Sequence, residues 1–411
     1  MIMGIKLTVI GGSGLYTPLL FDAIANYQEE IDFDEICLNG RTASKLEKVA
    51  RLSQSVIDKS EYDFKVTYTT DRQEALQGAE LVLCQIRVGG MKARAYDEEF
   101  PLKYDIIGEE TVGPGGFANA LRTVPVMLEL ASQMEEYCPE ALLINLTNPA
   151  SIVQQAIEQE TTVNVISLCD LPVGVLNKIA KMLDVDRAEL RYDYFGLNHL
   201  GWYQQLSIRG EDRTAEVIEE VDSLDLGINS EWIKNLEVIP LPYLKYYYHH
   251  STEVEKAKEK DILRAEELIE TSDEIAKALE ESPETIPELI YQRGAIWYSD
   301  VIVPLIAAIV NDKNEEFILN IANNGLLEGI ADEVIVEVAT IVNGSGIRAL
   351  EVGEIPLQVK SLLQQEANYR NLATQAAISQ AKGDILKALV VNPQVPNYEI
   401  AYQIWKEEFS K

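Results

Sequence analysis

Short apolar strands alternate with amphipathic helices through the first 170 or so residues, and this alternation constrains the fold more than any other feature. Strands are predicted at residues 6–10, 35–39, 64–69, 81–86 and 141–145, with one more ending at Cys169, and helices at residues 19–29, 43–58, 71–78, 118–136 and 151–159. Such alternation with short turns is typical of a parallel sheet with helices on both faces. We therefore predict an α/β fold built on a Rossmann-type, doubly wound parallel sheet.

The turn after the first strand is rich in glycine and leads directly into a helix. It contains Gly11, Gly12 and Ser13, followed by Gly14. A strand, a glycine turn and a helix together aim backbone N–H groups at the pyrophosphate of a dinucleotide. The spacing departs from a strict GxGxxG, so an ordinary tight connection between strand and helix remains the alternative.

The second predicted strand ends at Asn39, where an NAD-binding fold usually places an acid for the ribose hydroxyls. The missing carboxylate, together with the nearby Arg41, leaves room for a 2′-phosphate. NADP is therefore considered beside NAD. The alternative is that Arg41 is a solvated surface residue.

Two polar segments follow strands of the predicted sheet. Residues 86–117 combine glycines, charges and few apolar repeats, and they contain Arg94 and Glu110. We predict a long loop that forms part of a site, because long loops inside compact domains are usually functional or disordered. Asn148 follows the strand at 141–145, at the carboxyl end where open α/β sheets bind ligands.

Cys169 and His199 each stand at or just beyond the end of a predicted strand. Thiolate and imidazole are ligands that hold divalent transition ions, and His199 is one of only 3 histidines in the chain. A buried cysteine is more often a small hydrophobic residue. These two positions alone therefore leave a metal site and a structural role open.

Beyond His199 the alternation stops. Residues 213–290 are mainly helical and acidic, residues 297–310 form a buried helix, residues 317–342 suggest a small strand-and-turn element, and residues 356–388 and 397–409 are helical. Because 411 residues exceed one typical core, we expect a dinucleotide-binding domain at 1–168 and a second domain for catalysis, substrate and oligomerisation at 169–411. Taken alone, the tyrosines around Tyr243 indicate core or interface packing, and Arg264 indicates a solvated helix face.

Composition excludes several classes of function. A formal net charge of −32 argues against nucleic-acid and anionic-membrane partners, which need basic patches. No run approaches the roughly 20 apolar residues that span a bilayer, and the first residues lack the layout of a signal peptide. The 4 cysteines lie in separate segments without metal or disulfide spacing. We expect reduced thiols and a cytoplasmic location.

Several stretches together resemble glycoside hydrolase family 4, the NAD- and divalent-metal-dependent glycosidases that include 6-phospho-α- and 6-phospho-β-glucosidases. The matching stretches begin at Val9 (VIGGS), Ile86 (IRVG), Arg94 (RAYDE), Pro101 (PLKY), Ile107 (IGEETVGPGG), Asn145 (NLTNP), Cys169 (CDLP), Gly196 (GLNH), Pro242 (PYLKYY), Leu263 (LRA) and Asn323 (NNG). They run in order along essentially the whole chain. The resemblance implies a Rossmann-type domain followed by a mainly helical α+β domain, as in lactate and malate dehydrogenases.

Carried over position by position, the resemblance assigns roles to the residues above. Cys169 and His199 match the ligands of Mn²⁺ or another divalent metal, Tyr243 matches the catalytic base, and Asp170 matches the acid of the α-type members. The cofactor turn is matched by Gly11, Gly12 and Ser13. Substrate-binding positions are matched by Arg94, Asn148 and Arg264, and we add Glu110 and Asn198 as further candidates for substrate binding. Two departures stand out. Ser13-Gly14 replaces the usual Gly-Ser, and Asn39 replaces the usual aspartate, which leaves the choice between NAD and NADP open.

The implied chemistry is an exception to the paired-carboxylate scheme of most glycosidases. NAD⁺ takes hydride from sugar C3, and the resulting ketone acidifies the proton at C2. The metal stabilises the enediolate as a Lewis acid, and a tyrosine whose pKa is lowered by the cation removes the proton. The leaving oxygen departs with help from Asp170, water adds back, and the hydride returns. Arginines near the sugar suit a 6-phosphate.

The expected substrate is thus a small sugar phosphate, with 6-phospho-α-glucosides favoured because Asp170 follows Cys169. A 6-phospho-β-glucosidase and a hydrolase of unphosphorylated glycosides or uronides remain alternatives within the family. Two further classes are an NAD(P)-dependent 2-hydroxy acid dehydrogenase, which would accumulate NADH, and a non-catalytic dinucleotide sensor. Neither has a reason to hold Cys169, His199 and Tyr243 within about 10 Å, the scale of metal bonds plus one sugar. A homodimer or homotetramer is expected from the resemblance.

Overall fold

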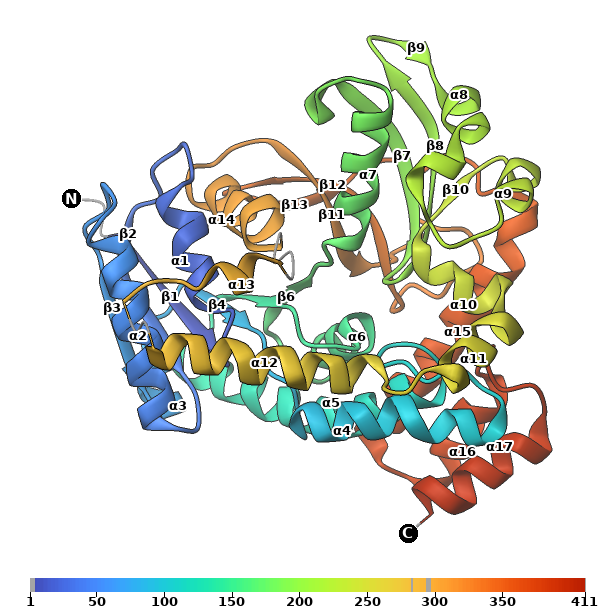
Figure 1. Cartoon of the computed structure of the whole chain (residues 1–411), viewed down its shortest axis with the longest axis horizontal. Coiled ribbons are helices and arrows are strands. Elements are labelled where there is room, and N and C mark those ends of the chain that lie inside the picture. Colours follow the sequence, from blue (N-terminus) through green and yellow to red (C-terminus); the bar gives the residue numbers. More distant parts are fainter. Residues whose placement is uncertain (1–3, 282–283, 293–296, 411) are drawn as a thin grey trace.

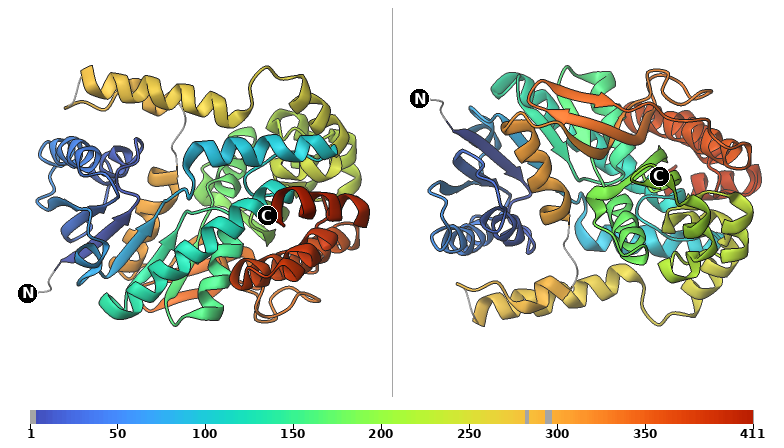
Figure 2. Two further views of the ribbon diagram at one scale, coloured as in Figure 1. Left: turned by 90° about the horizontal axis from the view of Figure 1, so that it is seen from below. Right: turned by 90° about the horizontal axis from the view of Figure 1, so that it is seen from above.

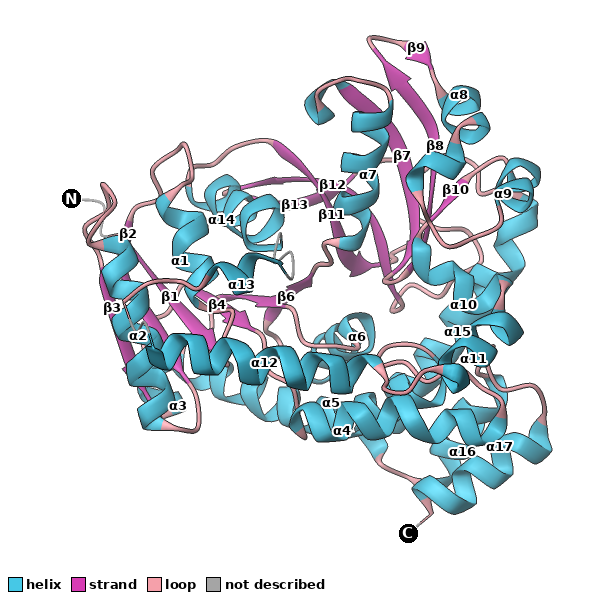
Figure 3. Cartoon of the chain, in the orientation of Figure 1, coloured by secondary structure: helices cyan, strands magenta, loops and turns pink. Residues whose placement is uncertain are grey.

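In the computed structural model, which describes residues 4–281, 284–292 and 297–410, the strands join into one mixed sheet flanked by helices (Figures 1 and 3). The strands are β1 (Ile5–Ile10), β2 (Phe33–Asn39), β3 (Lys65–Thr69), β4 (Leu81–Cys84), β5 (Leu142–Asn145), β6 (Asn164–Ser167), β7 (Leu190–Leu197), β8 (Leu200–Ile208), β9 (Glu211–Asp212), β10 (Ile239–Pro240), β11 (Glu315–Ala322), β12 (Ile335–Asn343) and β13 (Gly346–Ala349). The main path through the sheet is β10-β8-β7-β12-β11-β6-β5-β4-β1-β2-β3.

The first six strands are parallel and lie in the order β3-β2-β1-β4-β5-β6. This is the order of the doubly wound dinucleotide-binding sheet, and the predicted Rossmann-type fold is confirmed. The order in which successive strands are added to the sheet reverses between β1 and β4, so a crevice forms at the carboxyl ends of these two parallel strands, where such sheets bind ligands.

Helices cover both faces of this parallel sheet, because successive residues of a strand point to opposite sides and a central strand such as β4 is apolar and buried on both. The helices of the first half are α1 (Pro18–Ala25), α2 (Ala43–Ile57), α3 (Arg72–Leu76), α4 (Gly90–Glu99), α5 (Gly113–Tyr137), α6 (Ala150–Glu160) and α7 (Leu171–Met182), with 3-10 turns η1 (Phe100–Tyr104) and η2 (Arg187–Glu189). On one face Val9 packs with Leu20 of α1. On the other, Val82 packs with Met127 of α5 and Val153 of α6.

The prediction of a continuous long loop at residues 86–117 was wrong. Most of this segment is helical, as α4, η1 and the beginning of α5. Helix α4 buries Arg94, Asp97 and Glu98 instead of apolar side chains, so it carries no hydrophobic period for sequence analysis to detect. These charges are buried because each is paired, for example Asp97 with Arg122 of α5.

The strand-and-turn element predicted at 317–342 is part of the main sheet and not a separate unit. Strand β11 pairs antiparallel with β6 through Asn320 and Ser167, and β12 pairs antiparallel with β7. The sheet therefore continues across the predicted boundary between residues 168 and 169. Hydrophobic periodicity identifies strands but does not say which strand pairs with which.

Apart from strands β7 to β13, the second half is helical, and its mainly helical character was expected. Its helices are α8 (Thr214–Glu219), α9 (Ser230–Leu236), α10 (Lys245–Tyr248), α11 (His250–Glu259), α12 (Arg264–Glu281), α13 (Glu288–Gln292), α14 (Val303–Val310), α15 (Leu357–Ser379), α16 (Lys382–Val391) and α17 (Tyr398–Ile404), with short turns η3 (Val221–Leu224), η4 (Pro242–Leu244), η5 (Tyr298–Ile302) and η6 (Trp405–Phe409). Helix α12 lies along the outside of the molecule beside α4 (Figure 2). Across the described ranges, none of the helices combines the length and the apolar character needed to cross a bilayer.

The connection between η1 and α5 packs so closely on α4 that only glycine fits at residue 108. A Cβ added at Gly108 would stand 1.6 Å from the carbonyl oxygen of Glu98. A contact this short forces the backbone of one segment away from the other. Gly108 thus holds the residues after it, Glu109 and Glu110, against α4.

We predict that Gly108→Ala lowers the free energy of unfolding by about 1–3 kcal/mol, the usual cost of overpacking a tight interior. Urea unfolding followed by circular dichroism measures it. Gly174→Ala in α7 is the matched control, because a Cβ there meets nothing within 4 Å. In a helix interior that change should stabilise by about 0.5–1 kcal/mol. Equal stability of the Gly108→Ala protein and the wild type would contradict the close approach.

Candidate functional site

A cavity of about 540 Å³ opens at the carboxyl ends of β1, β4, β5 and β6. Nine of the predicted site residues line it: Gly11, Arg94, Glu110, Asn148, Cys169, Asp170, Asn198, His199 and Tyr243. The other five predicted residues, Gly12, Ser13, Asn39, Arg41 and Arg264, are not among its lining residues. Residues from both halves of the chain therefore meet around one cavity that also touches the glycine turn.

The two candidate metal ligands reach the cavity because the sheet continues beyond β6. Cys169 follows β6 directly, and His199 lies in the two-residue loop between β7 and β8. The loop is tight, with Leu197 paired to Leu200 and His199 at a left-handed φ of 64°. Asn198 donates from Nδ2 to Glu337 Oε1 at 3.1 Å, so this loop is tied to β12.

His199 is held by two neighbours. Its Nδ1 lies 2.9 Å from the hydroxyl of Thr111, and its ring stands 4.2 Å from the ring of Tyr243, centroid to centroid. Burial, followed by the charge of Arg370, lowers the pKa of His199 to about 4. The imidazole is therefore neutral near pH 7, which is the form that ligates a metal.

Cys169 is a free thiol, as are Cys37, Cys84 and Cys138. Burial raises the pKa of the Cys169 thiol well above its ordinary value, and the carboxylates of Asp170 and Glu337 raise it further. A metal must therefore displace the thiol proton when it binds. This donor pair fits a divalent transition ion.

Within the described residues, no three His, Cys, Asp or Glu side chains gather into a complete ligand cluster. An ion held by Cys169 and His199 would have its remaining coordination positions open to oxygens of substrate or water. Such an open position is characteristic of catalytic rather than structural metal sites.

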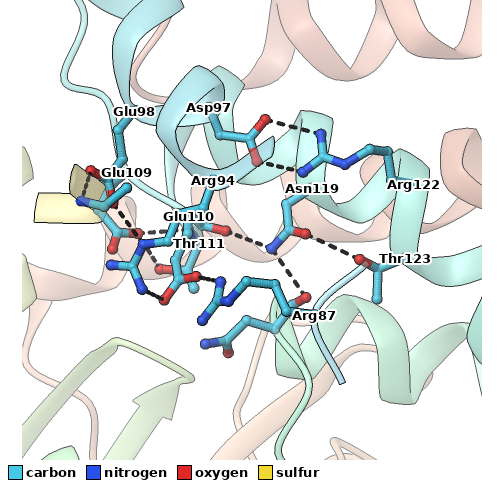
Figure 4. Close-up of polar contacts among 12 residues, drawn as sticks. Arg87, Arg94, Asp97, Glu98, Glu109, Glu110, Thr111, Asn119, Arg122 and Thr123 are labelled. Carbon is cyan, nitrogen blue, oxygen red and sulfur yellow. Dashed lines mark hydrogen bonds and ion pairs between the residues drawn. The ribbon is translucent and has the colours of Figure 1, made fainter. Parts of the chain in front are cut away.

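Glu110 sits between two arginines at the cavity wall (Figure 4). Arg94 Nη1 lies 3.0 Å from Glu110 Oε1, and Arg87 pairs with the other carboxylate oxygen. Burial raises the pKa of Glu110, but Arg87 and Arg94 outweigh burial and hold it below its ordinary value. Arg94 also donates from Nε to Glu98 at 2.7 Å. The carboxylates thus fix two cationic side chains at the edge of the cavity.

Asn119 of α5 joins the segments that carry these groups. Its Nδ2 donates to the carbonyl of Glu110 and to the carbonyl of Asn148, both at 3.1 Å. One buried amide therefore connects the loop before α5 with the turn after β5. Asn148 is held at the cavity by its backbone as well as by its place at the strand end.

Tyr243, the first tyrosine of its cluster, points into the site from η4. Its hydroxyl donates to Glu109 Oε1 at 3.2 Å. Burial, then the charge of Glu109, raises the pKa of Tyr243 well above its ordinary value. In the protein alone this side chain is a neutral phenol, so it becomes a base only where an adjacent cation lowers its pKa.

Asp170 lies at the cavity between Cys169 and α7. Burial is the largest influence on its carboxyl and raises the pKa. A carboxyl with a raised pKa can hold a proton at higher pH than an exposed one, which suits a general acid.

Arg264 lies away from the cavity lining. It begins α12, is exposed, and pairs with Glu267. Its neighbour Ala265 donates a backbone N–H to Glu98 at 2.7 Å. Helix α12 contributes Ser272 to the cavity lining and contacts the Arg94 pair through Glu98, and the substrate role of Arg264 stays a prediction.

The glycine turn has the close packing that a dinucleotide needs. Gly11 adopts φ +91°, and a Cβ at Gly12 would stand 2.8 Å from Leu38 Cβ. The N–H groups of Gly11 and Gly12 both donate to the carbonyl of Asn39, at 3.0 and 2.8 Å. The first two strand ends are thereby locked together, with Ser13 next along the turn.

A second hollow of about 490 Å³ lies beside this turn and contains Asn39 and Arg41. Asn39 donates from Nδ2 to the carbonyl of Thr69 at 3.0 Å, which leaves its Oδ1 as an acceptor. Arg72, which also lines the hollow, is engaged by Glu129. Among the described residues, no carboxylate forms an ion pair with Arg41. Unlike Arg72, the Arg41 guanidinium is therefore not paired within the described part of the chain.

Sequence reasoning missed several residues that hold the site: Arg87, Glu109, Thr111, Asn119 and Glu337. Arg87 and Thr111 lie in stretches that carry the family resemblance, Ile86-Arg-Val-Gly and Gly-Glu-Glu-Thr, and this was the available signal for them. Glu337 stands in an otherwise apolar strand. A charge in such a strand signals a buried polar contact, but its partners lie at distant positions that no spacing reveals.

Comparison with known proteins finds family matches along nearly the whole chain. Residues 6–185 match the model described as Family 4 glycosyl hydrolase, and residues 194–395 match the model of its C-terminal domain. The chain is 34% identical to the "Probable 6-phospho-beta-glucosidase" of Bacillus subtilis, with 99% of this chain and 96% of that protein covered. These matches confirm the resemblance drawn from the sequence motifs.

Solved structures of similar fold agree with these family matches. The 6-phospho-beta glucosidase from Thermotoga maritima with manganese, NAD⁺ and glucose-6-phosphate has a TM-score of 0.88 at 30% identity, covering 98% of this chain and 97% of that one. A 6-phospho-alpha-glucosidase from gut microorganisms with NAD and glucose-6-phosphate has a TM-score of 0.87 at 27% identity, covering 98% and 96%. Malate dehydrogenase from Plasmodium falciparum shares the fold alone, with a TM-score of 0.57 at 12% identity.

The hollow around Arg41 yields a prediction about cofactor choice. Arg41→Ala should weaken NADP⁺ binding by about three- to tenfold, since a charge-assisted contact to the 2′-phosphate contributes on the order of 1 kcal/mol at an exposed site. NAD⁺ binding should not change. Quenching of intrinsic fluorescence measures both affinities.

The matched control is Arg51→Ala, which removes an exposed arginine of α2 that does not line the hollow. Asn39→Asp should also disfavour NADP⁺, because the new carboxylate repels the phosphate. Unchanged NADP⁺ affinity in the Arg41 variant would show that Arg41 is a solvated surface residue that does not contact the 2′-phosphate.

Proposed function

Because the chain belongs to family 4 of the glycosyl hydrolases, we propose that it hydrolyses 6-phospho-glucosides with the help of NAD and a divalent metal such as Mn²⁺. The observation that carries the proposal is the meeting of Cys169, His199 and Tyr243 around one cavity that also includes Gly11 of the dinucleotide turn. A plain dehydrogenase of the same fold needs no thiol and imidazole pair there.

Cys169 and His199 would hold the metal, and the glycine turn would hold the dinucleotide. When bound, NAD supplies a reversible hydride acceptor and the metal supplies a Lewis acid. The neutral His199 and the open coordination positions described above fit this use. Asn198, the neighbour of His199, is held by its hydrogen bond to Glu337 of β12.

Tyr243 then removes the proton from the carbon next to the oxidised one. A base must lie within hydrogen-bond reach of the proton that it takes, and Tyr243 lines the cavity beside His199. Asp170 gives a proton to the departing oxygen. Arg94 and Arg87 supply cationic hydrogen-bond donors for the sugar phosphate, which must be captured locally because the protein carries a net charge of −32.

The α anomer is the first candidate, because Asp170 places a carboxyl with a raised pKa at the cavity, beside Cys169. The β anomer is the second, because the 34% identical relative is named as a β enzyme. We also propose a cytoplasmic homodimer or homotetramer, in line with the free thiols.

The direct test is hydrolysis of p-nitrophenyl α- and β-glucoside 6-phosphates with Mn²⁺ and NAD⁺ in reducing buffer. We expect nitrophenol release from one anomer, a complete stop when either metal or dinucleotide is omitted, and no net NADH. Accumulation of NADH without cleavage would instead support the alternative hypothesis of a 2-hydroxy acid dehydrogenase. Cleavage only of unphosphorylated glycosides or uronides would show that the substrate is not a sugar phosphate, although the enzyme class would be the one proposed.

The role of Tyr243 gives a sharper prediction. Tyr243→Phe keeps the ring that packs on His199 but removes the hydroxyl, and kcat should fall by about 10²- to 10⁴-fold, the usual contribution of a general base. Exchange of the substrate C2 proton with D₂O, followed by NMR, should be lost in parallel.

Tyr246→Phe is the matched control, because Tyr246 contacts the Tyr243 ring at 5.4 Å yet does not line the cavity. It should retain both activities. Retained C2 exchange in Tyr243→Phe would exclude Tyr243 as the base.

A further inference from the structure

A short relay behind His199 consists of Thr111 and Glu109, neither of which lines the cavity. The Thr111 hydroxyl lies 2.9 Å from His199 Nδ1 and 2.5 Å from Glu109 Oε2. The same Oε2 accepts the backbone N–H of Thr111 at 2.6 Å. The hydroxyl is therefore shared between a carboxylate and an imidazole.

The direction of these hydrogen bonds follows from a count of hydrogens. A threonine hydroxyl has one hydrogen to donate, and it goes to Glu109 Oε2, the oxygen that also accepts the backbone N–H of Thr111. The Thr111 hydrogen therefore points to Glu109, and the lone pair of its oxygen faces His199. Nδ1 must then carry the imidazole hydrogen, and Nε2 is left with a free lone pair.

Resting on the metal site of the proposed function, we infer that Thr111 and Glu109 are positioning residues that fix the tautomer and orientation of His199 so that Nε2 faces the metal. Groups behind a metal-bound histidine commonly play this part, and their loss typically lowers metal affinity by about 10- to 100-fold. Neither residue touches the substrate in this role.

The relay is built into a rigid part of the structure. The close approach of Gly108 to Glu98 anchors the preceding backbone, and α5 begins two residues after Thr111. The other carboxylate oxygen of Glu109 accepts the hydroxyl of Tyr243 at 3.2 Å. One carboxylate thus orients both the candidate metal ligand, through Thr111, and the candidate base.

The first test measures Mn²⁺ affinity in the NAD-loaded protein, by EPR of free Mn²⁺ during titration. Thr111→Val keeps the shape of the side chain and removes the hydroxyl, so affinity should fall by about 10- to 100-fold. Thr111→Ser restores the hydroxyl and should retain most of the affinity. Thr340→Val is the matched control, since it removes a buried hydroxyl that donates to the Phe317 carbonyl at 2.9 Å and should leave affinity unchanged.

The second test reads the tautomer directly, without metal or substrate. The chain has only 3 histidines, so ¹⁵N-histidine labelling gives few signals, and loss of one in His199→Gln assigns it. Wild-type His199 should show protonated Nδ1, and Thr111→Val should shift it toward protonated Nε2. His249 is an internal reference, because its Nε2 accepts the N–H of Asn229 at 2.9 Å and should not respond.

The outcomes separate this inference from the proposed function. Unchanged affinity in Thr111→Val, or an unchanged His199 tautomer, overturns the relay, because both readouts must move together. Absence of Mn²⁺ binding by the wild type overturns the metal assignment in the proposed function. In that case the tautomer experiment still decides whether Thr111 orients His199.

Discussion

The buried carboxylate of Glu337 joins the two halves of the molecule. It accepts Tyr194 OH at 2.6 Å, Asn198 Nδ2 at 3.1 Å and Asn320 Nδ2 at 3.0 Å. Asn320 also donates to the carbonyl of Ser167 at the end of β6. The parallel sheet and the antiparallel extension are thereby connected just where the chain delivers Cys169 and His199. Removing the Glu337 carboxylate would leave the Tyr194 hydroxyl and the Asn198 amide buried without this acceptor, which is costly inside a protein.

Around this junction the site is arranged so that its reactive groups stay neutral in the absence of a cation. Burial raises the pKa of the Cys169 thiol and of the Tyr243 phenol, and it lowers that of His199. A divalent ion bound between the two ligands changes the local electrostatics most strongly for the groups nearest to it. In the proposed mechanism, metal binding would therefore also activate Tyr243, and the base would stay inactive in the metal-free protein.

Much of the fold could be predicted from the sequence, and the reasons are visible in single elements. Strands such as β1, β4 and β5 contain short apolar runs between turns, and such a run is local information. Helix α4 was missed because its buried residues Arg94, Asp97 and Glu98 are charged. The pairing of β6 with β11 was missed because it depends on one contact between Ser167 and Asn320, which are far apart in the sequence.

The same distinction, between local sequence patterns and contacts of distant residues, holds for the site. Nine of the fourteen predicted residues line the cavity, because strand ends and family motifs mark them. The residues that support them were not identified, since a supporting role depends on the direction of a hydrogen bond and not on residue type. Thr111 is an example, because nothing in its chemistry distinguishes it from other threonines until His199 is placed beside it.

The two-residue loop between β7 and β8 has a consequence for how this protein can change during evolution. His199 is at the tip of a hairpin whose register is set by Leu197 opposite Leu200, and a slip of one residue turns every following side chain to the other face of the sheet. Single substitutions around His199 keep its place, whereas an insertion or deletion in this hairpin removes the ligand altogether. Length variation should therefore accumulate elsewhere, for instance at the exposed residues 260–262 between α11 and α12.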